Sequence, residues 1–266
     1  MRCLTLVLSL LAAPVTAHEF WIEPLRYQIA GDRNLEANIV NGQEFSGRSL
    51  PYVPGQFVNF VLFSGDETAR VRGRAGDRPA LNQAPVQEGL NIAAYQAKNA
   101  VVNYETWGKF QTFIDHKDLG NLLPRHQERG LPEENFSEIY SRYSKSLIGV
   151  GNSAGSDRRA GLETELVALN NPYTDDLTNG FSVQLFYREN VRANEQIEVF
   201  EKRRGEAASI NLYRTDDQGI ATFPVKPGHR YMIDAVVIRE PTAQLAEMTG
   251  AVWETLWANL TFATPE

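Results

Sequence analysis

The chain has 266 residues, of which 42% are hydrophobic and 22% charged, and its formal net charge at pH 7 is −7. No run of Lys or Arg is longer than residues 202–204. A nucleic-acid partner is therefore not expected, because neutralising phosphates requires a basic face. The one cysteine is Cys3, which lies in a segment that we expect to be removed.

Residues 1–17 have the pattern of a cleavable secretory signal. Arg2 supplies the positive charge, residues 4–13 form a short apolar core, and residues 15–17 (Val-Thr-Ala) provide a small-residue cleavage site. Cleavage after this site leaves 249 residues that begin at His18 and contain no cysteine. We therefore expect an acidic periplasmic protein whose mature chain does not enter a membrane.

Residues 18–104 are expected to form an antiparallel β-sandwich. The runs at 35–40, 57–63 and 91–95 favour strands, and residue pairs such as Asn41-Gly42 between them favour turns. Short strands with frequent turns are typical of this architecture.

Residues 105–162 are expected to form a helical insertion and a linker. Apolar side chains recur at helical spacing at positions 107, 110, 113 and 114, and again at 136, 139, 140, 143 and 147. We predict two or three helices between Glu105 and Ile148. The glycine- and serine-containing stretch 149–161 is predicted to be a mobile linker or an exposed loop.

Residues 163–266 are expected to form a second small β-sandwich. Strand signals resume at 163–169 and repeat at a spacing of roughly ten to twelve residues, which is typical of sandwiches. The expected strands end with the run 256–263. The fold class predicted from the sequence is therefore mainly β, with two sandwiches and a helical insertion between them.

The C-terminal region resembles transthyretin-like or carboxypeptidase-regulatory-like sandwiches. The resemblance rests on the turn of residues 215–223 (Thr-Asp-Asp-Gln-Gly-Ile-Ala-Thr-Phe) and on the Pro-Gly-His-Arg-Tyr run of residues 227–231. In such modules a "TD-x-x-G" turn feeds one strand and a "PG-x-Y" turn feeds the next, and the glycines permit positive φ at each corner.

The chain as a whole resembles the bacterial domain-of-unknown-function family 4198. The stretches that carry this resemblance are His18 to Pro24, Tyr140 to Lys145, Glu165 to Val167, Asn171 to Tyr173 and Trp253 to Phe262. Members are often described as periplasmic components of nickel or cobalt uptake, so the resemblance implies such a role. Relatives often carry a histidine late in the strand that is here Tyr231 to Arg239, and this chain has none there.

A transition-metal site in a cysteine-free chain must be built from histidines and carboxylates. An N-terminal His18 offers two nitrogens, its α-amine and its imidazole Nδ1, which together close a chelate ring on Cu²⁺ or Ni²⁺. The candidates for the remaining ligands are His116, His126, His229, Glu19 and Glu254. These residues also have explanations without a metal. The histidines can be ordinary solvated or turn residues, and the tryptophans beside Glu254 can simply pack against the core.

We expect a non-catalytic periplasmic protein that binds nickel, cobalt or copper, with a metal-uptake transporter as its partner. The sequence contains no phosphate-cradling glycine loop and no His-Glu-x-x-His motif, so enzyme activity is not expected. One alternative is an envelope module that binds a protein or a glycan without metal. Another is a histidine-brace copper oxygenase.

Overall fold

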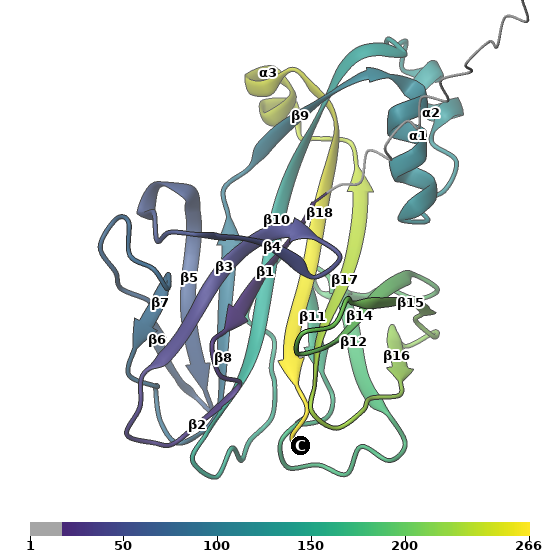
Figure 1. Ribbon diagram of the computed structural model, residues 1–266. Helices are drawn as coiled ribbons and strands as arrows, with labels where there is room; N and C mark the ends of the chain where they lie inside the picture. The colour runs from purple at the N-terminus through teal and green to yellow at the C-terminus, as the bar shows by residue number, and fades with distance from the viewer. Residues whose placement is uncertain (1–17) are drawn as a thin grey trace, which may run out of the picture.

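The computed structural model describes residues 18–266 and shows a mainly β protein, as the sequence predicts. The predicted signal segment, residues 1–17, lies outside the described residues. In Figure 1 two β-sandwich regions stand side by side, and a helical region lies above them at the far ends of the longest strands. No helix within residues 18–266 has both the length and the apolar character needed to cross a bilayer.

The first sandwich pairs a four-stranded sheet with one end of a larger sheet. The small sheet consists of β1 (Glu19–Pro24), β3 (Leu35–Gln43), β4 (Ser46–Leu50) and β7 (Leu81–Gln83). Opposite lie η1 (Pro54–Gln56), β5 (Phe57–Ser64), β6 (Glu67–Arg70) and β8 (Gly89–Ala97). Apolar side chains such as Ile22, Leu35 and Leu62 are fully buried in one cluster between the layers, which confirms the predicted N-terminal strands.

The second sandwich is built in the same way around a core of aliphatic and aromatic side chains. Its small sheet consists of β11 (Thr164–Ala168), β12 (Phe181–Tyr187), β13 (Asn190–Val191) and β16 (Ile220–Phe223). The strands opposite are β14 (Gln196–Arg203), β15 (Ser209–Arg214), β17 (His229–Arg239) and β18 (Ala251–Ala263). Asp216 accepts hydrogen bonds from the amides of Gln218 and Ile220, and Gly219 has φ +73°, as expected of the predicted turn.

One ten-stranded sheet runs through both sandwiches. Its main order is β15-β14-β17-β18-β10-β8-β5-β6, and β2 (Gln28–Ile29) and β9 (Ala100–Thr106) also pair with β10 (Glu134–Val150). Strand β10 is parallel to β18 and antiparallel to β8 and β9. The two sandwiches therefore share a backbone hydrogen-bond network, with β10 at its centre.

The predicted helix over residues 136–147 is wrong, because this segment is the 17-residue strand β10. From Tyr143 to Val150 every residue is buried, since both faces of the sheet are covered there. A strand that is buried on both faces loses its polar–apolar alternation, and its apolar positions can then imitate helical spacing.

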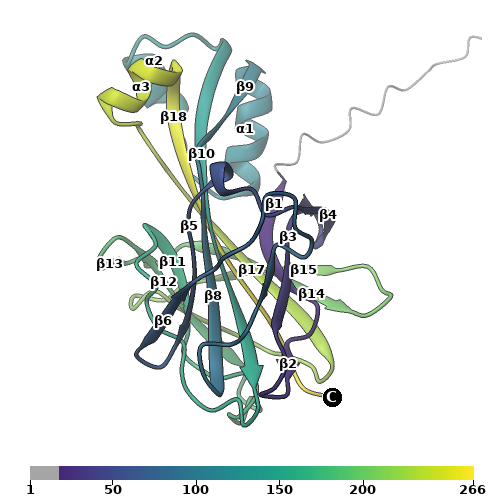
Figure 2. The ribbon, with the colours of Figure 1, turned by 90° about the vertical axis from the view of Figure 1, so that its left-hand side faces the viewer.

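The helical insertion is shorter than predicted. It consists of α1 (Trp107–His116) and α2 (Leu123–Glu128), and α3 (Ala243–Thr249) connects β17 to β18. Figure 2 shows α1 beside the upper parts of β9 and β10. The side chains of Phe110, Phe113 and Trp253 share an apolar cluster there, so α1 covers the part of the sheet that extends beyond the sandwiches.

The segment 149–161, predicted as a mobile linker or exposed loop, is fastened by buried charges. The ammonium of Lys145 on β10 lies 2.8 Å from a carboxylate oxygen of Asp157 and 3.1 Å from Glu165 on β11. All three side chains are almost fully buried. This ion triad ties the connecting segment and the second sandwich to the central strand.

Replacing Lys145 with Met should destabilise the protein strongly. The substitution keeps most of the side-chain volume but leaves the buried carboxylate of Asp157 without its cation and that of Glu165 with Arg159 alone, which costs about 3 to 5 kcal/mol. Urea unfolding of the variant measures the loss in the free energy of unfolding. The matched control is Lys98→Met, since Lys98 is exposed. A Lys145 variant as stable as the control would contradict the structural role of the triad.

Candidate functional site

A cavity of about 310 Å³ lies between α1 and the extended part of the sheet. Strands β9, β10 and β18 and helix α1 supply its walls, and His18, directly before β1, lies at its edge. Its aromatic lining residues are Tyr104, Phe113, Tyr140 and Trp257. The volume falls in the range of small-molecule sites, which combine apolar walls with a few polar groups.

A buried carboxyl group, that of Glu138 on β10, is held by hydroxyl donors in the wall of this cavity. Tyr104 donates to its Oε2 at 2.9 Å, and the Thr255 hydroxyl donates to its Oε1. Trp257 Nε1 donates in turn to the Thr255 oxygen at 3.0 Å. Burial raises the pKa of Glu138 to about 7, so near neutral pH both protonation states are populated.

Arg142 lies two residues after Tyr140 on β10. It lines the cavity and also contacts the residue before β1. Its Nη2 donates to the main-chain carbonyl of His18 at 2.9 Å, and its guanidinium lies 4.5 Å from the ring centroid of Tyr140. Its Nε is buried and has no hydrogen-bond partner. Within residues 18–266 no carboxylate lies at ion-pair distance from Arg142, although Asp234 and Glu138 favour its charged form from farther away.

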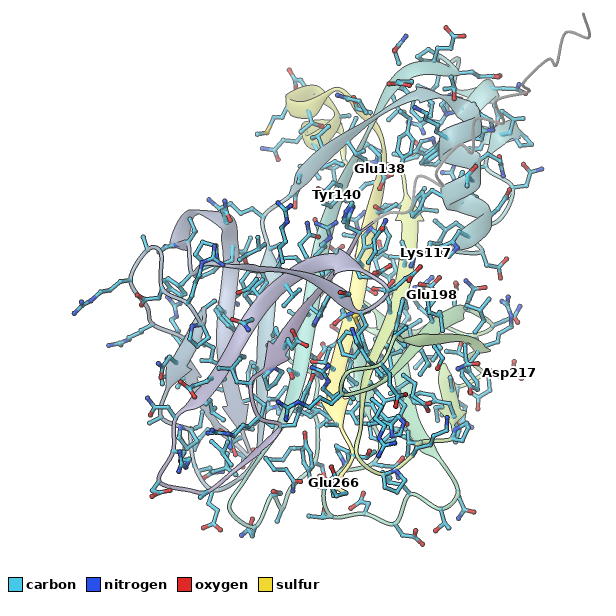
Figure 3. All side chains as sticks on the ribbon, viewed as in Figure 1. Lys117, Glu138, Tyr140, Glu198, Asp217 and Glu266 are labelled. Carbon is cyan, nitrogen blue, oxygen red and sulfur yellow. The ribbon has the colours of Figure 1, made fainter. Side chains whose placement is uncertain are left out.

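A second polar cluster lies on the other side of Trp257, whose ring centroid is 4.8 Å from Lys117 Nζ. Lys117 follows α1 and contacts Glu198 on β14 at 2.5 Å and Asp234 on β17 at 3.0 Å. Figure 3 shows Lys117 and Glu198 together at the lower end of α1, with Glu138 and Tyr140 above them. All three side chains of the Lys117 ion triad are nearly inaccessible to solvent.

Glu19 and His116 join this second cluster. Burial raises the pKa of Glu19 to about 7, and the charges of Asp234 and Glu198 act in the same direction. Glu19 Oε2 is buried without a hydrogen-bond partner. The imidazole Nε2 of His116 lies 2.9 Å from Glu198, and this contact raises the pKa of His116. The fold thus brings three of the sequence candidates, His18, Glu19 and His116, to one end of β1.

The other three candidates lie elsewhere and already have partners. His126 is fully buried, its Nδ1 accepts from Trp253 Nε1 at 3.0 Å, and its Nε2 lies 2.9 Å from the Pro132 carbonyl. His229 begins β17 and contacts the carbonyl of Pro227. Both oxygens of Glu254 accept from Arg239, at 2.7 and 2.8 Å. None of these three faces the cavity.

Sequence reasoning missed Glu138, Arg142 and Lys117. A signal was present in the first two, because a charged residue among buried positions of a long strand must have a partner or a ligand. The misassignment of residues 136–147 as a helix concealed that signal. Within residues 18–266, no three His, Asp or Glu side chains converge as a group that could hold a metal ion.

Residues 151–155 read Gly-Asn-Ser-Ala-Gly, which matches the nucleophile-elbow pattern Gly-x-Ser-x-Gly. Ser153 has φ +56° and is 3% exposed. An extended segment without a helix follows it, whereas the elbow is a strand-to-helix turn that exposes its serine. The local structure is therefore a tight turn after β10 in which the serine alone is buried.

A family model described as "Domain of unknown function (DUF4198)" matches residues 15–239, which is most of the chain. A comparison with the curated proteins found no match.

Glu138→Gln should change how stability depends on pH. The folded-state pKa of about 7 lies above the ordinary 4.5, so folding takes up a proton between these values and stability falls as the pH rises through this window. The contribution amounts to about 2 to 3 kcal/mol between pH 5 and pH 8. Urea unfolding at both pH values measures it.

The variant cannot ionise, so it should lose less stability than the wild type over this interval. Glu134→Gln is the control, because Glu134 is an exposed residue of the same strand. An equal pH dependence in wild type and Glu138→Gln would show that Glu138 does not titrate in this window.

Proposed function

The chain belongs to the DUF4198 family, whose description names no activity, and from its site we propose that it is a periplasmic, non-catalytic protein that captures nickel, cobalt or copper for uptake. Export and cleavage after Ala17 would give His18 a free α-amine. The metal is cargo that passes to an uptake transporter.

The observation that carries this proposal is the position of His18. Its side chain is exposed at the edge of the cavity, and it also borders an open groove with Asn41 and Arg48. Its main-chain carbonyl is fixed by Arg142, and β1 begins at the next residue. The backbone is thus held directly behind the α-amine and the imidazole, which reduces the entropy lost when both nitrogens bind one ion.

Glu19 supports a cation at this end of β1. Its buried carboxyl has an oxygen without a partner, and the neighbouring carboxylates of Glu198 and Asp234 oppose its ionisation. A divalent cation nearby would favour the charged form. The α-amine that cleavage creates would add a nitrogen ligand to the side-chain ligands of residues 18–266. Water or a small ligand would fill the remaining coordination positions of the metal ion. His116, on the helix that borders the cavity, is the histidine best placed to assist.

Metal titration of the processed protein tests this proposal. Isothermal titration with Ni²⁺, Co²⁺ and Cu²⁺ should show one site with a dissociation constant below about 10⁻⁵ M, or about −7 kcal/mol, for at least one of them. His18→Ala in the processed protein should weaken binding by about tenfold or more, because it removes one arm of the chelate.

The control is His229→Ala, at the start of β17, which should bind metal like the wild type. Equal affinity of the His18 and His229 variants would contradict the assignment of His18. Absence of binding to all three ions would contradict the proposed function itself.

A metal-independent envelope interaction module is the second candidate. Strand β15 is an edge of the ten-stranded sheet and exposes Ile210 and Leu212, which are 42% and 59% accessible. An apolar edge strand can pair with a strand of another protein. Leu212→Lys would impair pairing of β15 with a partner strand and leave metal binding intact. The variant therefore separates the interaction module from the metal-binding protein.

A further inference from the structure

The cavity is larger than a bare ion requires. One water molecule takes up about 30 Å³ in the liquid, and the cavity has about 310 Å³. Beyond His18, its lining includes Val102, Phe113, Tyr140 and Trp257, whose side chains provide mostly apolar area. Such walls suit an organic molecule.

The charges that line the cavity favour an anion. Lys109 and Glu105 both line it but neutralise each other at 2.5 Å. Glu138 is only partly ionised near neutral pH, since burial raises its pKa to about 7. Among the described side chains that line the cavity, Arg142 is therefore the cation that no carboxylate contacts within ion-pair distance.

Among the described residues, no carboxylate lies within ion-pair distance of Arg142; Asp234 and Glu138 favour its charged form only from farther away. Burial lowers its pKa, because the guanidinium has lost much of its water. It receives in exchange the carbonyl of His18 and the ring faces of Tyr140 and Phe20, none of which carries a negative charge. A buried Arg without a carboxylate is costly unless a ligand supplies one.

We propose that this cavity binds a small organic carboxylate, whose carboxylate pairs with Arg142 and whose apolar body lies against Tyr140, Phe113 and Trp257. The guanidinium suits this ligand because its planar N–H groups match the geometry of a carboxylate. The inference does not depend on metal binding at His18, and it adds a second ligand class to the protein.

The test is a titration of the ¹⁵N-labelled processed protein in EDTA, followed by NMR at the Trp257 indole N–H and the Arg142 Nε–H. The probes are 3-phenylpropionate, its neutral amide and 3-phenylpropylamine, which share one apolar body and differ in charge. The carboxylate should shift both signals saturably with a dissociation constant below about 1 mM. The amide and the amine should bind at least about tenfold more weakly.

Arg142→Gln should weaken binding of the carboxylate by about tenfold or more, while Arg204→Gln, at an exposed turn, should leave it unchanged. The probe series on the wild-type protein keeps the test decisive if the Arg142 variant does not fold. The proposal is overturned if the carboxylate gives no saturable shift up to about 10 mM. Preference for the amine, or wild-type affinity in a folded Arg142→Gln variant, overturns it equally.

Discussion

The parallel pairing of β10 with β18 is the constraint on which the rest of the structure depends. Residues 138–146 of β10 pair with residues 253–261 of β18, and this pair lies where the two sandwiches and the helical region meet. Both faces of β10 are covered along most of its length. Any charged side chain on the covered part of this strand must therefore be compensated by its neighbours or by a ligand.

Three charged side chains of β10 meet this requirement in different ways. Lys145 has the carboxylates of Asp157 and Glu165, so its role is structural. Glu138 has the hydroxyls of Tyr104 and Thr255 and a raised pKa, so much of its charge is suppressed by protonation. Arg142 has a carbonyl and aromatic faces, and Asp234 and Glu138 act on its charge without forming an ion pair. The charge of Arg142 is therefore the one of the three that a ligand would compensate most.

Part of the fold was predictable from strand-forming runs and turn residues. The run 57–63 and the turn at Asp216 to Gly219 indicate a strand and a corner directly, and the structure confirms both. The central strand was not predictable in this way. Its apolar period reflects burial on both faces, which a single sequence does not distinguish from one face of a helix.

The site was predictable only in part. The position of His18 at the predicted cleavage site drew attention to the end of β1 that borders the cavity. His116 lies at the end of α1, a helix that the spacing of apolar residues predicted. Arg142, Glu138 and Lys117 could not be grouped from sequence, because pairing across β9, β10, β14, β17 and β18 brings them near β1. His126 resembled a polar surface residue, but it is a core residue with both ring nitrogens occupied.

The central claim is that export exposes His18 as an amino terminus at the edge of the cavity. Mass spectrometry of the exported protein tests it most directly by identifying the first residue of the mature chain. The account predicts an N-terminal peptide that begins His18-Glu19-Phe20 and carries an unmodified α-amine. A chain that keeps residues 1–17, or that begins at any other position, would contradict it.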